Sequence, residues 1–435
     1  MLTRCLPQTI DPVGDATASL SLPLRSVIFL APLIVLGSHA LLVRRYRRRL
    51  RATPVVRRPH PLGALDREED LTQEVDIRVR AERGGMIALV AGILGVCFGG
   101  LITGGAAQTV VLYASAGLIA LGPAEFPKLA YRLMSPGRPL PAHFRTEVRE
   151  LIRGPFKAVT DPAERARLAL AGFLRLASFA LLAFSVTTLP AALLPSTGTR
   201  WRLFPVVLFV VGYPLLRFAT RLRSGVITRS KTFEPAEFLA LTVESTGALL
   251  RSFTDDSARL ATRASIRLSD MEFLSVGSRA DRFERILAWA LWPYVPTFAL
   301  TDPKRMSRTD PGMGRITLPE KDPWQPLATS LIERAAVLVV LVGDSPSLLW
   351  EIENLAANSR IERTLFVIPP TISGRSERVR SIASLVGLPD PELADDQPVI
   401  GFCIDEIGFR WFTSELADEH AYAVMVERFV GVDPK

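Results

Sequence analysis

The chain has 435 residues, of which 48% are hydrophobic and 22% charged, and its formal net charge is +8 at pH 7. A positive mean hydropathy of +0.24 at this length predicts two or three domains, part of which lies in lipid. The three cysteines, Cys5, Cys97 and Cys403, and the four histidines are scattered along the chain. This spacing excludes a disulfide framework, and we expect no metal site.

The first apolar stretch, SVIFLAPLIVLGSHALLV at 26–43, is about as long as a tilted helix that crosses a bilayer. The basic run RRYRRRLR follows it at 44–51, whereas a secretory signal peptide carries its positive charge before the apolar run. By the positive-inside rule, segment 1–25 is external and residue 44 onward is cytoplasmic. Four more apolar stretches follow, so the predicted spans are 26–43, 86–105, 108–125, 171–195 and 203–220.

The charge of the connecting segments agrees with five spans. Residues 126–170 and the stretch RFATRLRSGVITRSK after the last span are both basic, as cytoplasmic segments are. The Pro- and charge-rich segment 52–83 is predicted to be a connector with a short helix around 66–82. We therefore expect a multi-pass protein of the bacterial cytoplasmic membrane, in contact with the lipid bilayer. Its predicted parts are a membrane region at 26–225, a linker at 226–240 and a cytoplasmic domain at 241–435.

The membrane region favours an anchor or sensor over a transporter. Ionisable residues inside spans are the usual mark of a transport pathway, and only His39 lies deep within a predicted span. In GILGVCFGGLITGG, Gly95 precedes Gly99 by four residues and Gly100 precedes Gly104 by four. Small residues at this spacing let helices approach closely, either within one chain or between copies. We expect a homo-oligomer and no nucleic-acid partner.

The cytoplasmic half alternates short apolar runs with amphipathic stretches. Buried strands that alternate with helices predict an α/β domain with a parallel five-stranded sheet, helices on both faces, and the flavodoxin-like strand order 2-1-3-4-5. The predicted strands are 247–253, 295–301, 337–342, 364–370 and 398–404. The predicted helices are 279–294, 324–336, 347–357, 377–388 and 418–430.

In such a sheet, ligands bind beyond the carboxyl ends of the strands where the strand order reverses, here between the first and third strands. SFTDD at 252–256 and GDSPSLLWE at 343–351 follow those two strands. Carboxylates gathered there suit gripping ribose hydroxyls or stabilising a cationic transition state. Asp and Ser also cap helices and form turns, and we favour N-capping for Ser345 and Ser347. The candidate ligand-binding residues are Ser252, Asp255, Asp256, Asp302, Asp344, Ser345 and Trp350.

ALLRSFTDD, an amphipathic helix, and then VLVVLVGDSPSLLWEIENL together resemble the Toll/interleukin-1 receptor (TIR) domain, over about residues 245–405. The resemblance implies the same five-strand winding, and it extends to bacterial membrane proteins with a cytosolic domain of this kind. In enzymatic members a Glu four residues after the Trp acts on the ribosyl cation as nicotinamide leaves NAD. Here that position is Asn354, and the available carboxylates are Glu351 and Glu353, about 200° apart on a helix. We choose Glu351 as the catalytic residue.

Two functions follow from this comparison. The first is a membrane-anchored signalling or defence-type effector whose TIR-like domain binds or cleaves a nucleotide such as NAD, which would then be a substrate. The second is a non-enzymatic module for self-association or partner binding, and transport is a distant third. For the enzymatic function we expect Glu351 to be partly exposed and ionised, facing Asp255 or Asp256, while Glu353 points toward solvent or a neighbouring helix.

Overall fold

The structure is a computed structural model, and it divides into two compact units. Unit 1 comprises residues 1–44, 87–122 and 169–221, and unit 2 comprises 45–86, 123–168 and 222–435. The residues that the structure describes are 67–102, four positions between 111 and 118, 125–136, 140–141, 157–192, 199–241, 246–251, 259–261, 280–301, 312–318, 323–369, 374–395, 397–415 and 417–431. The helices α3 (Thr72–Ile102), α6 (Pro162–Ala192) and α7 (Thr199–Ser230) each contain residues of both units.

The prediction of five membrane spans is wrong. Among the described residues, a single helix, Leu203–Ser230 within α7, is long and apolar enough to cross a membrane. The predicted connector helix at 66–82 and the predicted span at 86–105 are largely one helix, α3, and both α3 and α6 begin in charged turns. Hydropathy alone had separated the apolar turns of these helices from the charged turns that precede them. The predicted span at 26–43 and most of 108–125 lie outside the described residues.

Unit 1 exposes much apolar surface. Of the 21 large hydrophobic side chains that are exposed among the described residues, 14 belong to unit 1, including Ile87, Phe173 and Leu176. Large exposed apolar patches are typical of surfaces that contact protein or membrane.

Small residues bring helical segments of unit 1 close together. A side chain on Gly212 of α7 would lie 3.2 Å from Leu181 and Leu182 of α6. A Cβ on Gly95 would overlap the hydroxyl of Ser115, a residue of the same chain. Gly95, the first glycine of the predicted pattern, therefore supports close packing within the chain.

Replacing Gly95 with Leu should lower the thermal unfolding midpoint of the detergent-purified protein. The new side chain has to displace Ser115, and overpacking of this kind costs about 1–3 kcal/mol. Gly172→Leu on α6 is the matched control, because nothing lies within 4 Å of a Cβ at that position. Equal midpoints for the two variants would contradict the close approach at Gly95.

Unit 2 is built on a nine-stranded sheet with the order β1-β11-β10-β9-β8-β3-β6-β7-β2. The strands from β9 to β2 in this order run parallel to their neighbours, whereas β10 is antiparallel to both β9 and β11. The strands are β1 (Glu68–Asp70), β2 (Thr232–Phe233), β3 (Thr246–Leu250), β6 (Thr297–Thr301), β7 (Gly314–Thr317), β8 (Ala335–Leu341), β9 (Thr364–Val367), β10 (Val399–Asp405) and β11 (Gly408–Thr413). A separate two-stranded sheet pairs β4 (Arg259–Ala261) with β5 (Ala280–Arg282).

The prediction of a parallel five-stranded sheet is therefore wrong. The five segments predicted as strands lie side by side as β6-β3-β8-β9-β10, but the last of them is antiparallel and four more strands extend the sheet. β7 is formed by the short stretch GRIT, for which no strand was predicted. β11 follows β10 through a tight turn, where Gly408 has a φ of 124°. Short edge strands such as β1 and β2 carry too few residues for an alternating pattern to reveal them.

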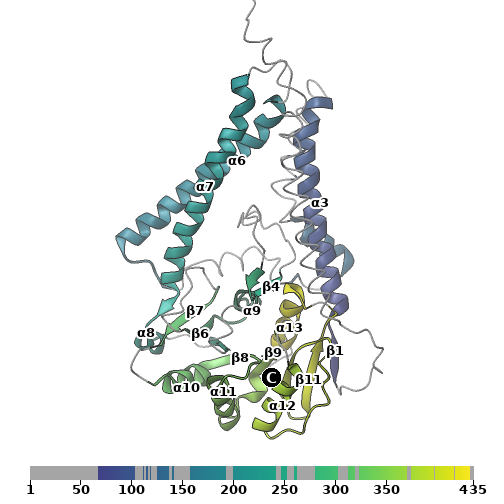
Figure 1. The fold of residues 1–435 in the computed structure, drawn as a ribbon, viewed down its shortest axis with the longest axis vertical. Helices are drawn as coiled ribbons and strands as arrows, with labels where there is room; N and C mark the ends of the chain where they lie inside the picture. The colour runs from purple at the N-terminus through teal and green to yellow at the C-terminus, as the bar shows by residue number, and fades with distance from the viewer. Residues whose placement is uncertain are drawn as a thin grey trace, which may run out of the picture. The chain divides into compact units, whose positions relative to one another are not determined.

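Helices cover both faces of this sheet (Figure 1). Alternate residues of each central strand face opposite sides, so Leu338 and Val340 of β8 join one core while Val339 and Leu341 join the other. The first core packs under α10 (Gln325–Arg334), α11 (Pro346–Ala357) and α12 (Arg375–Leu385), with the short α8 (Pro235–Leu239) at its edge. The second packs under α9 (Phe283–Leu291), α13 (Glu419–Gly431) and the first turns of α3.

The first turns of α3 are held on the sheet by apolar contacts and by charge. Leu71, Val75 and Val79 are buried in the second core. Arg78, also buried, donates hydrogen bonds of 2.6 Å to Glu74 on its own helix and to Glu427 on α13. A buried guanidinium requires such partners, because its transfer from water is otherwise very costly.

Candidate active site at the carboxyl edge of the sheet

The reversal of strand order lies between β3 and β8. After β3 the chain passes to β6 and β7 on one side, and α10 then returns it to β8 on the other side of β3. The carboxyl ends of these two parallel strands meet at one edge of the sheet, which is where open α/β sheets bind ligands. Arg251 follows β3 directly, and α11 begins five residues after β8 ends.

A buried ion pair occupies this edge. The Arg251 guanidinium lies 2.7 Å from the carboxylate of Glu284 on α9, and the two side chains are only 4% and 5% exposed. The pair is close to neutral as a unit.

Glu351 of α11 is the second buried carboxyl group of this edge, with an exposed fraction of 4%. Burial raises its pKa from 4.5 to about 8, and the charge of Arg251 opposes this shift only in part. Its Oε2 atom has no hydrogen-bond partner among the described residues. At neutral pH the Glu351 carboxyl is therefore mostly protonated, which corrects the expectation of a partly exposed, ionised side chain.

Burial is the main cause of this protonation, and the nearby charge of Arg251 does not overcome it. With Glu351 neutral, Arg251, Glu284 and Glu351 together carry no net charge. Ionisation of Glu351 would leave one uncompensated negative charge in a buried place, which is costly. A cation placed against the ionised Glu351 would lower this cost.

The other described candidate residues have structural roles. Ser345 is the N-cap of α11 and accepts a hydrogen bond from the backbone N–H of Leu348 at 3.4 Å. Asp344 is exposed and forms an ion pair with Arg378 of α12 at 3.1 Å. Trp350 packs edge-to-face on Trp324, with ring centroids 4.9 Å apart.

Of the remaining residues, two lie on α11 and four lie outside the described part of the chain. Glu353 is exposed, as expected for the neighbouring face of α11. Asn354, at the position of the catalytic Glu in the TIR pattern, donates a hydrogen bond of 3.0 Å to Thr329 of α10. Four candidates lie outside the described residues, namely Ser252, Asp255, Asp256 and Asp302.

Sequence reasoning missed Arg251 and Glu284. Both carried a usable signal: Arg251 stands immediately after the buried run of β3, and Glu284 sits among the apolar residues of α9. A charged residue in such a context is buried only when it is paired. Comparison of the chain with protein-family models, with curated proteins and with solved structures finds no match. The resemblance to TIR domains therefore stays a prediction.

Replacing Glu351 with Gln should remove a pH-dependent loss of stability. The pKa of Glu351 is 4.5 in the unfolded chain and about 8 in the folded one, so the folded state binds the proton more tightly. Its contribution to stability consequently falls as pH rises from 4.5 to about 8, by roughly 3 kcal/mol at pH 7. Gln mimics the protonated form at every pH.

The measurement is the thermal unfolding midpoint between pH 5 and pH 9 (about the range in which the Glu351 carboxyl loses its proton). The midpoint of Glu351→Gln minus that of the parent should increase with pH. The exposed Glu353→Gln should show a constant difference across the same range. A constant difference for Glu351→Gln as well would mean that its pKa is not raised.

Proposed function

We propose that this protein is a membrane-anchored enzyme that hydrolyses the N-ribosyl bond of a nucleotide with a cationic base, with NAD as the candidate substrate. The observation that carries the proposal is the buried Glu351 carboxyl at the strand-order reversal, with a pKa near 8 and an Oε2 atom that no described residue bonds. Perturbed carboxyl groups at such positions are characteristic of active sites.

The charge of the site selects the ligand class. Arg251 is already paired with Glu284, so it does not call for an anionic partner. Glu351 gains a favourable ion pair only when a positive charge approaches it. The pyridinium ring of oxidised NAD and the oxocarbenium-like ribose that forms as its bond breaks are both cationic, and the second develops only in the transition state.

The reaction is a balanced hydrolysis. The bond between C1′ of the ribose and the pyridinium nitrogen breaks, and its electron pair leaves with nicotinamide, which becomes neutral. Water adds to C1′ and releases a proton. Because the leaving group needs no proton, the useful form of Glu351 is the carboxylate, which stabilises the positive charge at C1′.

The apolar helices support the membrane part of the proposal. α7 contains the candidate spanning helix, and unit 1 exposes large apolar side chains on α3, α6 and α7. Contact with lipid would remove this apolar surface from water. This function keeps the enzymatic domain next to a membrane, as a signalling or defence-type effector would require.

The test is nicotinamide release by the detergent-purified full-length protein incubated with NAD. Glu351→Gln keeps the side-chain shape but cannot ionise, so kcat/KM should fall at least about 100-fold, as with other losses of transition-state charge stabilisation. Glu353→Gln on the exposed face of the same helix should retain full activity. Equal turnover by the parent and Glu351→Gln would refute the role of Glu351.

The pH profile gives a second test. Since kcat/KM reports the free enzyme and the carboxylate is the active form, kcat/KM should rise about tenfold per pH unit up to the Glu351 pKa of about 8 and then level off. A profile that is flat, or that falls through pH 8, would contradict an active carboxylate.

One observation favours a non-enzymatic alternative. The position that carries the catalytic Glu in the TIR pattern is Asn354, and its side chain bonds Thr329 in a helix–helix contact. If the parent protein neither cleaves NAD nor is stabilised by it, the domain acts as a self-association or partner-binding module. Concentration-dependent association of the full-length protein would then be the property to measure.

A further inference from the structure

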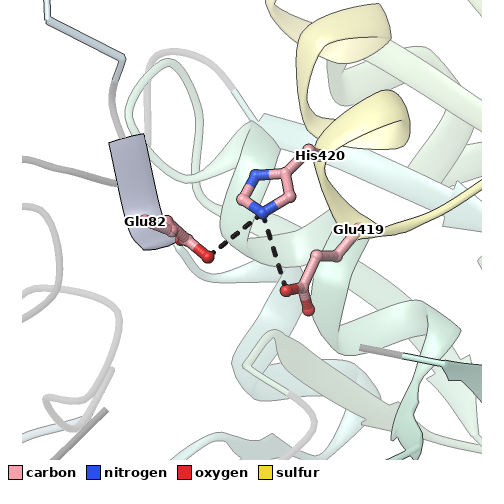
Figure 2. A group of neighbouring side chains, drawn as sticks. All are labelled: Glu82, Glu419 and His420. Atoms are coloured by element: carbon pink, nitrogen blue, oxygen red, sulfur yellow. Dashed lines mark hydrogen bonds and ion pairs between the residues drawn. The ribbon is translucent and has the colours of Figure 1, made fainter. Parts of the chain in front are cut away.

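A second group of ionisable side chains lies where α3 meets α13 (Figure 2). Glu82 comes from α3, and Glu419 and His420 are the first two residues of α13. The Nε2 atom of His420 is 3.2 Å from Oε2 of Glu82 and 3.8 Å from Oε1 of Glu419. One ligand atom from each of the three residues falls within 4.8 Å of the others.

The surrounding structure holds the two helix segments that carry these side chains. Asp418 caps the first turn of α13, because its Oδ1 accepts the backbone N–H groups of His420 at 3.0 Å and Ala421 at 3.1 Å. The Arg78–Glu427 bond joins the same two helices. Glu419 and His420 are buried, so their donor atoms are held in a largely dry environment.

The local field attracts positive charge. Three carboxylates, those of Glu82, Asp418 and Glu419, lie close enough to the His420 imidazole to act on its charge. Counting only Glu82, Glu419 and His420, the group carries one net negative charge when the imidazole is protonated. A divalent cation in place of that proton would bring the same three side chains to neutrality.

We propose that Glu82, Glu419 and His420 bind a divalent transition-metal ion of the zinc type, which joins α3 to α13. Imidazole nitrogen and carboxylate oxygen are zinc ligands at about 2.0–2.2 Å, which places neighbouring ligand atoms of a tetrahedron about 3.3 Å apart. The 3.2 Å separation of His420 from Glu82 already matches, and the 3.8 Å separation from Glu419 closes with a small side-chain shift. Three protein ligands leave the fourth position for water.

The sequence conceals this group, because 338 residues separate Glu82 from His420. The metal would act as a crosslink between α13 and the beginning of α3. It is independent of the proposed hydrolysis, because none of the three residues belongs to the edge formed by Arg251, Glu284 and Glu351.

The experiment uses full-length protein stripped with a chelator, then titrated with Zn²⁺ by calorimetry and analysed for bound metal by mass spectrometry after dialysis. The parent should retain one equivalent of zinc after dialysis, and Glu82→Gln and His420→Gln should not. In the calorimetric titration, the zinc affinity of each variant should be at least tenfold weaker than that of the parent. Glu427→Gln is the matched control: it removes another α13 carboxylate that contacts α3 but leaves the three donors intact, so its zinc affinity should equal that of the parent.

Cobalt substitution supplies a readout of coordination. The parent loaded with Co²⁺ should show visible absorption from a low-symmetry site, and Glu82→Gln should lose it. Glu82 is only partly buried, so Glu82→Gln should fold and tests the proposal even if His420→Gln does not fold. No stoichiometric zinc in the parent, or the same affinity in the parent and Glu82→Gln, would overturn the proposal and leave an ion pair only.

Discussion

A charge buried in a protein has to be paired, bound to a cation or neutralised by a proton, and the carboxyl edge of the sheet depends on this rule. Arg251 and Glu284 satisfy it as a pair at 2.7 Å. Glu351 satisfies it by keeping its proton, with a pKa near 8. Burying Glu351 therefore lowers the stability of the fold at the position where the strand order reverses. The hydrolysis proposed above would give this unfavourable placement a purpose.

The group at the start of α13 follows the same rule differently. Around His420 the carboxylates outnumber the cation, and the imidazole keeps its proton to a pKa of about 9 despite complete burial. Glu351 therefore lies in a place that rejects negative charge, whereas the group at the start of α13 lies in a place that attracts positive charge. The environment of Glu351 raises the pKa of that carboxyl group, and the environment at the start of α13 is suited to holding a cation.

The sequence predicted the central elements of unit 2 because their signals are local. The runs that form β3, β6, β8, β9 and β10 are apolar and bounded by turns, and Ser345-Pro346 marks the start of α11. Strand direction is not local: β10 turns antiparallel because of its pairing with β9 and β11, which no pattern within β10 encodes. The membrane spans failed for a related reason, since hydropathy divides α3 into a connector and a span, although helical hydrogen bonding continues through both.

The site residues also divide into those marked by local sequence signals and those that depend on contacts between distant segments. The choice of Glu351 came from its place after a strand end, but its ionisation state depends on burial by segments distant in the sequence. Arg251 finds its partner on α9, and α9 is in turn packed against α13: Phe283, next to Glu284, meets Tyr422 edge-to-face at 4.6 Å. Tyr422 also donates a hydrogen bond of 2.7 Å to the carbonyl of Ile368, just beyond β9. The partner of Arg251 is therefore placed by packing between α9 and α13, which no pattern within either segment encodes.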